Sequence, residues 1–191
     1  MKKFVATLTL LIVAASCIRD VAVFYDSDPT FNHRSYETYR WEPVDPIERS
    51  QYPLYYNDLN HNRITAATDA VLAEKRYVTD TLSPDLTIHY HIVVEDKTIV
   101  FPHEMPRYAR DTETGGAEYQ YAEGTLILDF MDARTGKLMW RGWAVVQLEN
   151  IRNSDDVTIL FRSLVENILA AFPPCATTEN AEVNKTHNND R

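Results

Sequence analysis

Cysteine is scarce in this chain of 191 residues, which contains only Cys17 and Cys175. Cys17 belongs to an N-terminal segment described below, so Cys175 has no partner for an intramolecular disulfide, even in an oxidising compartment. We therefore predict that Cys175 is a free thiol and that a hydrophobic core alone stabilises the fold. With 45% hydrophobic residues, about 160 ordered residues suffice for one domain and are too few for two.

The chain has fewer positive than negative side chains: 19 lysine and arginine residues and 28 aspartate and glutamate residues give a net charge of −9. Removal of residues 1–16, predicted below, would take away Lys2 and Lys3 but no acid, and would lower the net charge to −11. Nucleic acids and anionic lipid headgroups both require a basic patch. The composition therefore predicts no nucleic-acid partner, and any attachment to a membrane must come from lipid chains.

Glycine is limited to five residues, all in the second half of the chain, and none forms a phosphate-binding loop of the GxGxxG or GxxxxGK[ST] type. No serine lies in a GxSxG motif, and His103-Glu104 lacks the second histidine of an HExxH site. In a chain this acidic, a pair such as Asp129 and Asp132 is more typical of a turn or a solvated face than of glycoside hydrolysis. We therefore predict no catalytic residue, no cofactor and no enzymatic activity.

The N-terminus has the organisation of a lipoprotein signal peptide. Lys2 and Lys3 precede an apolar or small stretch over residues 4–16, and Ala14-Ala15-Ser16-Cys17 resembles the lipobox that bacterial lipoprotein signal peptidase cuts. The 13 residues of that stretch are too few for a membrane-spanning helix, which needs roughly 20. We predict that residues 1–16 are a signal peptide and that Cys17 is the lipid attachment site.

This organisation also predicts where the protein lies. Residues 17–20 would form a short tether, residues 21–175 a single domain, and residues 176–191 a disordered polar tail. Acyl chains such as palmitate on Cys17 would hold the domain close to a membrane. Ile18 follows the cysteine where aspartate would favour the inner membrane, so we expect a lipid anchor in the outer membrane of the bacterial cell envelope.

Local patterns predict two helices and at least three strands. Apolar residues at helical spacing indicate one helix from near Asn60 and another that begins at Asn153 or Ser154 and ends before Pro173. Apolar residues alternate over 86–94, 126–130 and 138–148, which is typical of half-buried strands. The last two strands are predicted to form a hairpin through residues 132–136, with glycine in the left-handed position.

The fold class follows from these elements. We predict an α+β fold in which two amphipathic helices pack on one face of an antiparallel-rich, twisted sheet. Gly142 lies two residues from Trp140 on the same strand face. This spacing predicts that the indole packs over a position without a side chain.

Five motifs are spread over the domain: Tyr36-x-x-Tyr39-x-Trp41, Pro84-Asp85-Leu86, Glu123-Gly124-Thr125-Leu126, Asp132-x-x-Thr135-Gly136-Lys137-Leu138-x-Trp140-Arg141-Gly142 and Phe172-Pro173-Pro174. Together they resemble the bacterial lipoproteins catalogued as domain of unknown function 4136, over residues 21–174. The resemblance implies an envelope lipoprotein of α+β type and assigns no activity. Its relatives tend to have Lys-Gly where this chain has Lys75-Arg76. A left-handed arginine costs about 1 kcal/mol relative to glycine, so we expect a different exit from the first helix.

The second face of the predicted sheet is the candidate interaction surface, because it mixes apolar and polar side chains. Its residues are Trp143, Arg141, Ile127, His89 and His91, to which we add Tyr119 and Tyr121 from a long segment over residues 95–122. His89 and His91 alternate as a metal pair would, but the sequence supplies no third ligand, so we predict no metal site.

Two functional hypotheses follow. The preferred one is a non-enzymatic, membrane-anchored structural or protein-interaction module with an envelope protein or a glycan as partner. The alternative is a lipoprotein that binds a small ligand or a carbohydrate through the tyrosine-rich loops over residues 43–58 and 95–122, because tyrosine rings can stack on sugars.

Overall fold

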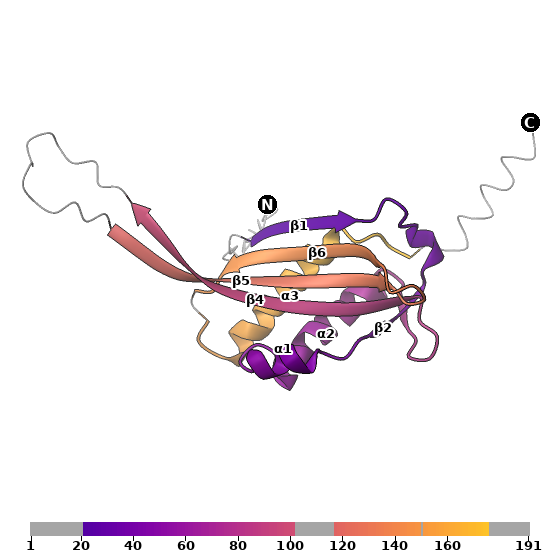
Figure 1. Cartoon of the computed structure of the whole chain (residues 1–191), viewed down its shortest axis with the longest axis horizontal. Helices are drawn as coiled ribbons and strands as arrows, with labels where there is room; N and C mark the ends of the chain where they lie inside the picture. Colours follow the sequence, from indigo (N-terminus) through magenta and orange to yellow (C-terminus); the bar gives the residue numbers. More distant parts are fainter. Residues whose placement is uncertain (1–20, 102–116, 150, 176–191) are drawn as a thin grey trace, which may run out of the picture.

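Six strands form one mixed sheet in the computed structural model, which describes residues 21–101, 117–149 and 151–175 (Figure 1). In the order of the sheet they are β1 (Val21–Ser27), β6 (Leu138–Gln147), β5 (Ala117–Asp132), β4 (Leu86–Phe101), β2 (Thr38–Trp41) and β3 (Val78–Thr79). Three α-helices accompany the sheet: α1 (Pro46–Gln51), α2 (Asp58–Glu74) and α3 (Ser154–Ala170). A 3₁₀ turn, η1 (His33–Ser35), precedes β2.

The predicted combination of a sheet and helices is confirmed, and the sheet is mixed. Strands β1, β6, β5 and β4 are antiparallel neighbours, whereas β2 runs parallel to both β4 and β3. A parallel pair requires a crossover connection, and α1 and α2 lie in the connection between β2 and β4. The sheet is therefore antiparallel on the β1 side and parallel at the β2 edge.

The period-two pattern has the predicted effect on burial. The even-numbered residues Leu86, Ile88 and Tyr90 of β4 are buried, and the register places them opposite Asp132, Phe130 and Leu128 of β5. The hairpin between β5 and β6 also forms as predicted. Gly136 has φ +67°, and its N–H donates to the Asp132 carbonyl at 2.8 Å.

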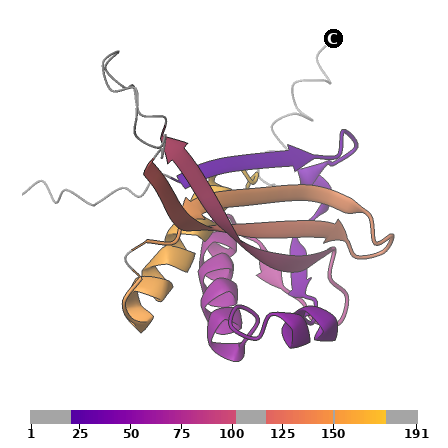
Figure 2. The same ribbon diagram turned by 60° about the vertical axis from the view of Figure 1, so that its left-hand side comes forward.

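Helices α2 and α3 lie together on one side of the sheet, as Figure 2 shows. Asn57 caps α2, its side chain accepting from the Asn60 N–H, and Asn153 caps α3 by accepting from two N–H groups. The apolar stripe of α3 includes Leu164 and Ile168, both of which belong to the core. The buried face of the sheet and the buried faces of both helices therefore form one hydrophobic core.

The third helix, α1, lies in the segment predicted only as a tyrosine-rich loop. Its start nevertheless has a recognisable signal: the Asp45 side chain accepts from the Ile47 N–H, and Pro46 occupies the first turn, where proline is favoured. The helix has six residues and none of them is buried. It is too short to show the apolar periodicity on which the other two helices were predicted.

The packing predicted for Gly142 is confirmed. A Cβ atom placed on Gly142 would lie 2.3 Å from Cη2 of Trp140 and 2.6 Å from Cγ2 of Ile168. The indole of Trp140 also meets Phe130 and Phe172 edge-on, at ring-centroid distances of 5.4 and 5.0 Å. Glycine is therefore required where β6 passes beneath this aromatic cluster.

The expectation of an unusual exit from α2 is wrong. Arg76 has φ +70°, the left-handed conformation that glycine would adopt. The N–H of Tyr77 donates to the Leu72 carbonyl at 2.9 Å and the N–H of Arg76 donates to the Ala73 carbonyl at 3.0 Å, which together form a Schellman motif. Tyr77 is buried beyond it, and Lys75 Nζ donates to the Phe172 carbonyl at 2.7 Å. Burial of the tyrosine and this helix-end contact offset the strain at arginine.

Several predictions concern residues outside the described ranges. These are the signal peptide over residues 1–16, the whole tether over residues 17–20 with its lipidated Cys17, the tail over residues 176–191 and the middle of the second long loop. Within the part of the chain that the structure describes, no helix is long and apolar enough to cross a membrane.

Candidate functional site

The face of the sheet opposite α2 and α3 presents the predicted interaction residues in cross-strand rows. Trp143 of β6 pairs with Ile127 of β5, and Ile127 pairs with His91 of β4. On the other side of β6, Phe24 of β1 pairs with Trp143. Four side chains from four adjacent strands therefore point to the same side, since directly paired residues share a face. We call this face the open face.

Phe24 is the member of this row that sequence reasoning missed. Its ring stacks on Trp143 with a centroid distance of 5.5 Å and an angle of 20° between the ring planes. Phe24 is 47% exposed, and the neighbouring Trp143 is half-buried. The continuous apolar run over residues 21–25 is typical of a strand, but the position of that strand beside β6 depends on a pairing across more than 100 residues.

The adjacent row is polar. Arg141 pairs with Asp129, and Asp129 pairs with His89. Arg141 Nε and Nη2 donate to the two carboxylate oxygens of Asp129, each at 2.6 Å, in the bidentate geometry that arginine and carboxylate favour. Asp129 is only 5% exposed, so its carboxylate is largely desolvated, whereas the Arg141 side chain remains partly exposed.

His91 connects this ion pair to α1. Its Nε2 lies 3.6 Å from Asp129 Oδ2, and its Nδ1 lies 3.0 Å from Glu48 Oε1. Glu48 is supplied by α1, 43 residues earlier in the chain, and was not predicted as part of the surface. The result is a continuous chain of alternating charge across the open face, from Arg141 of β6 through Asp129 of β5 and His91 of β4 to Glu48 of α1.

The pKa values of these groups follow from their neighbours. The Asp129 carboxylate raises the pKa of His91, burial opposes this shift and Glu48 adds to it. For Asp129, burial alone would raise the pKa, but hydrogen bonds from Arg141 and His91 outweigh it, so the net pKa is lowered. The network therefore favours an ionised Asp129 and a protonated His91.

Tyr119 and Tyr121 lie apart from this site. They belong to the arm in which β4 and β5 continue beyond β6 (Figure 1), and their rings stack at a centroid distance of 6.0 Å. The hydroxyl of Tyr119 donates to the Glu149 carboxylate. Tyr121 is six residues from Ile127 along β5, roughly 20 Å at the usual rise of a strand. The structure thus brings together Trp143, Arg141, Ile127, His89 and His91, but does not bring the two tyrosines to them.

The histidine pair does not gain further ligands from the fold. Among the described residues, no group of three or more histidine, cysteine, aspartate or glutamate side chains is placed to hold a metal ion. His91 instead uses both ring nitrogens for carboxylates, one on each side.

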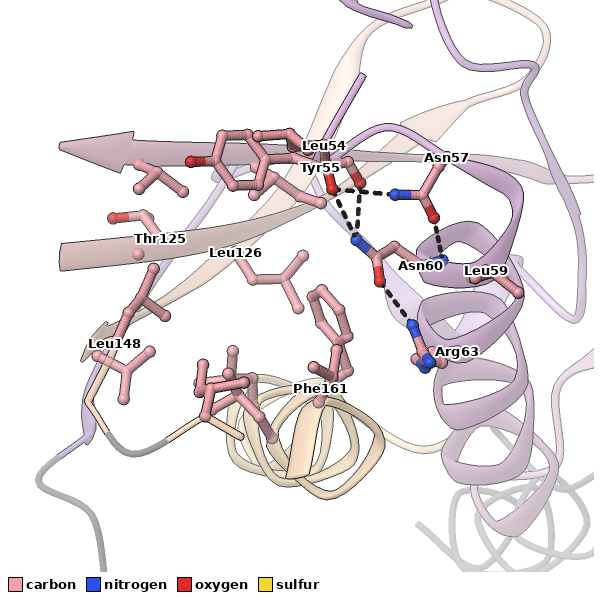
Figure 3. Close-up of a pocket in the computed structure, with 18 residues that line it drawn as sticks. Leu54, Tyr55, Asn57, Leu59, Asn60, Arg63, Thr125, Leu126, Leu148 and Phe161 are labelled. Atoms are coloured by element: carbon pink, nitrogen blue, oxygen red, sulfur yellow. Dashed lines mark hydrogen bonds between the residues drawn. The ribbon is translucent and has the colours of Figure 1, made fainter. Parts of the chain in front are cut away.

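A cavity of about 320 Å³ lies on the other side of the sheet, between α2, α3 and the strands β4, β5 and β6 (Figure 3). Its walls are mainly apolar and include Leu126, Val146, Leu148 and Phe161. No local pattern predicts this cavity, because its walls come from five elements and each apolar lining residue has the sequence pattern of an ordinary core residue.

The polar part of the cavity is on the α2 side. Asn60 Nδ2 donates to the Tyr55 carbonyl at 3.1 Å, and Asn60 Oδ1 accepts from Arg63 Nη1 at 2.8 Å, as Figure 3 shows for the latter pair. Arg63 then reaches α3, donating to Thr158 Oγ1 at 3.1 Å and Ser154 Oγ at 2.7 Å. Polar side chains therefore join the two helices at one end of an apolar space.

Comparison with known families identifies the domain. The model of the family described as "Domain of unknown function (DUF4136)" matches residues 23–174, which include every described strand and helix from β2 to α3. The chain belongs to the DUF4136 family. The resemblance drawn from the five sequence motifs is thereby confirmed. A comparison with curated proteins found no match.

A comparison with solved structures found matches at low identity. A PDZ domain protein from Parabacteroides distasonis matches with a TM-score of 0.47 and 11% identity, over 81% of this chain and 37% of the other. The chain thus spans little more than a third of that protein. A PelC dodecamer from Paraburkholderia phytofirmans matches with a TM-score of 0.43 and 9% identity, over 82% of this chain and 99% of the other. Neither match assigns an activity.

Proposed function

We propose that this DUF4136 protein is a lipid-anchored, non-enzymatic protein of the bacterial outer membrane that binds a protein partner through the open face. The anchor rests on the lipobox-like Ala14-Ala15-Ser16-Cys17. The observation that carries the binding function is the stacked pair of Phe24 and Trp143 on that face.

The composition of the open face favours a protein over a small polar ligand. Interfaces between proteins are enriched in aromatic residues and arginine, and their strongest contacts are aromatic anchors surrounded by a polar rim. Phe24 and Trp143 provide such anchors, and the ion pair of Arg141 and Asp129 lies in the adjacent row. Because Asp129 is already paired, the surface offers a fixed charge pattern without an unpaired buried charge.

The anchor is tested with the wild-type chain and Cys17→Ser in cells fed a labelled fatty acid. We expect the wild-type protein to carry the label and to sediment with outer membranes, and we expect Cys17→Ser to do neither. An unlabelled wild-type protein would remove the anchor from the proposal while leaving the open face to be tested separately.

The binding face is tested by placing a photoreactive amino acid at position 24 in intact cells. Position 82 is the matched control, because Leu82 is 93% exposed and lies in the loop between β3 and β4. We expect one discrete adduct from position 24 and none from position 82. The protein in that adduct, once purified, should bind the wild-type chain at least about tenfold more tightly than Trp143→Ala, as expected for a central aromatic anchor.

Two other outcomes would contradict a different protein as the partner. An adduct between two copies of this chain would make the open face a self-association surface. The absence of any adduct, together with binding to a glycan array that requires Tyr119 or Tyr121, would favour the alternative of a carbohydrate-binding lipoprotein. Tyr119 is 44% exposed and stacks with Tyr121, so a sugar could reach this pair.

A further inference from the structure

We infer that the cavity between α2, α3 and the sheet binds a single-chain amphiphile with an anionic headgroup, of the fatty-acid class. This site lies on the opposite side of the sheet from the open face, and it does not depend on the function proposed for that face. The inference rests on three features of the cavity, which are its size and walls, its opening, and the arginine at one end.

The size and the walls suit a hydrocarbon chain. At about 320 Å³, the cavity is roughly twice the volume of an engineered apolar cavity of about 150 Å³ that stays dry and binds benzene. It also reaches the lower end of the range for small-molecule sites, roughly 300 to 1,000 Å³. Its lining includes Ile92, Val94, Leu126, Val146 and Leu164, which offer no hydrogen bond to a polar ligand. An elongated apolar group would gain free energy by entering.

The opening is also apolar. Leu54 and Leu59 line the cavity and are 79% and 67% exposed, so the cavity reaches the surface beside two leucines. Large apolar side chains gathered at the mouth of an apolar space are typical of a ligand-binding site rather than of an accidental packing defect. A chain that enters here can remain in contact with apolar atoms from the surface inward.

Arg63 determines the kind of headgroup. In the described part of the chain, its guanidinium group donates to Asn60, Thr158 and Ser154, all through neutral oxygens, and forms no ion pair with a carboxylate. A half-buried guanidinium group held in this way can donate further hydrogen bonds to an anionic partner. A carboxylate or phosphate headgroup at this end of the cavity would supply the missing negative charge while the tail occupies the apolar part.

The first test measures binding of sodium octanoate, decanoate and dodecanoate by calorimetry, each below its aggregation concentration. The protein is the full chain with Cys17→Ser, so that no attached acyl chain competes for the cavity. We expect affinity to rise by about fourfold for each added methylene, which is the gain from burying one methylene group. Equal affinity for the three chains, or no binding of dodecanoate, would overturn the inference without requiring any cavity variant to fold.

The second test locates the site with variants in the same background. Leu148→Trp should fill the cavity and reduce dodecanoate affinity by more than about tenfold, and Val157→Phe serves if the first variant does not fold. Circular dichroism and the melting temperature report folding. A folded cavity-filling variant that binds dodecanoate as the parent chain does would place the ligand elsewhere and contradict the inference.

The third test measures how much the anionic headgroup contributes to binding. Arg63→Gln should weaken the affinity for dodecanoate by about tenfold, which corresponds to the loss of a charge-assisted hydrogen bond. The affinity for the neutral amphiphile dodecyl maltoside should stay within about twofold of the parent value. Arg63→Lys should restore most of the dodecanoate affinity. The matched control is Arg162→Gln, which removes an exposed arginine of α3 that does not line the cavity. It should leave the affinity for both ligands unchanged. Equal losses for both ligands in Arg63→Gln would assign the residue a structural role only.

Discussion

Strand β6 carries a tryptophan on each face, and the two side chains have different surroundings. Trp140 is 2% exposed and contacts Phe130, Phe172 and the bare backbone of Gly142. Trp143 is half-buried, and its aromatic contact is with the exposed ring of Phe24. The same residue type, three positions apart, thus belongs once to the core and once to the surface. The comparison indicates that one face of the sheet stabilises the fold and that the other leaves part of its aromatic surface exposed to solvent.

Replacing each tryptophan with alanine gives the largest expected contrast. Trp140→Ala should lower the free energy of unfolding by about 3 to 5 kcal/mol, because it opens a large cavity in the core. Trp143→Ala should lower it by about 1 kcal/mol, since part of the ring is already in water. Urea unfolding followed by circular dichroism measures both. If the two variants lost equal stability, the two faces would not have the distinct roles described here.

Gly142→Ala tests how tightly the buried face of β6 is packed. The new Cβ would lie 2.3 Å from Trp140 Cη2 and 2.6 Å from Ile168 Cγ2, neither of which can move freely within the core. We expect a loss of about 2 to 3 kcal/mol by overpacking. Gly124→Ala is the matched control: its Cβ would lie 3.0 Å from the mobile end of Leu148, so the loss should stay below about 1 kcal/mol. A Gly142→Ala variant as stable as the control would show that the indole can be displaced at little cost.

Arg76→Gly tests whether backbone strain at the end of α2 lowers stability. Arginine occupies a left-handed position with φ +70°, and glycine removes that strain. We expect the free energy of unfolding to rise by about 1 kcal/mol. Arg76→Ala keeps the Cβ atom and should give no increase, which separates backbone strain from loss of the arginine side chain. An equal effect of the two substitutions would rule out strain as the cause.

The pH dependence of the free energy of unfolding tests how much His91, on the open face, contributes to stability. Because folding raises its pKa from the ordinary value of 6.5, the protonated ring stabilises the folded state. That contribution is fully present below about pH 6 and is lost as the pH rises through the raised pKa. Asp129, whose pKa is lowered, stays ionised throughout this window. The half-exposed network is screened by solvent, so the expected contribution is below about 1 kcal/mol.

The measurement is urea unfolding between pH 5.5 and 8.5, a window chosen to bracket the ordinary histidine pKa of about 6.5. His91→Gln should remove part of the decrease in stability with rising pH that the wild-type chain shows. His89→Gln is the control, since within the described residues the His89 side chain makes no hydrogen bond or ion pair, and it should keep the wild-type dependence. An unchanged pH dependence in His91→Gln would mean that the network does not stabilise the fold.

Much of the fold could be predicted because its signals are local. The alternation over Leu86 to Val94, the cap at Asn153 and the left-handed Gly136 each depend on neighbouring residues only. The parallel pairing of β2 with β4 could not be predicted in this way, since it depends on how the chain crosses the sheet.

The candidate site could be predicted only in part, for the same reason. Trp143, Ile127 and His91 were identified because strand alternation places each on the same face. Phe24 and Glu48 were missed because they reach this face from β1 and α1, through contacts distant in sequence. The cavity was missed because apolar residues that line a cavity have the same local pattern as residues that fill a core.

Hydroxyl-radical footprinting of the two tryptophans tests the central claim most directly, by comparing the purified protein with the protein in intact cell envelopes. Trp140 should be protected in both samples, since it is 2% exposed. Trp143 should be oxidised in the purified protein and protected at least about fivefold in the envelope, where a bound protein would exclude water from the contact. Equal oxidation of Trp143 in both samples would contradict a role for the open face in binding.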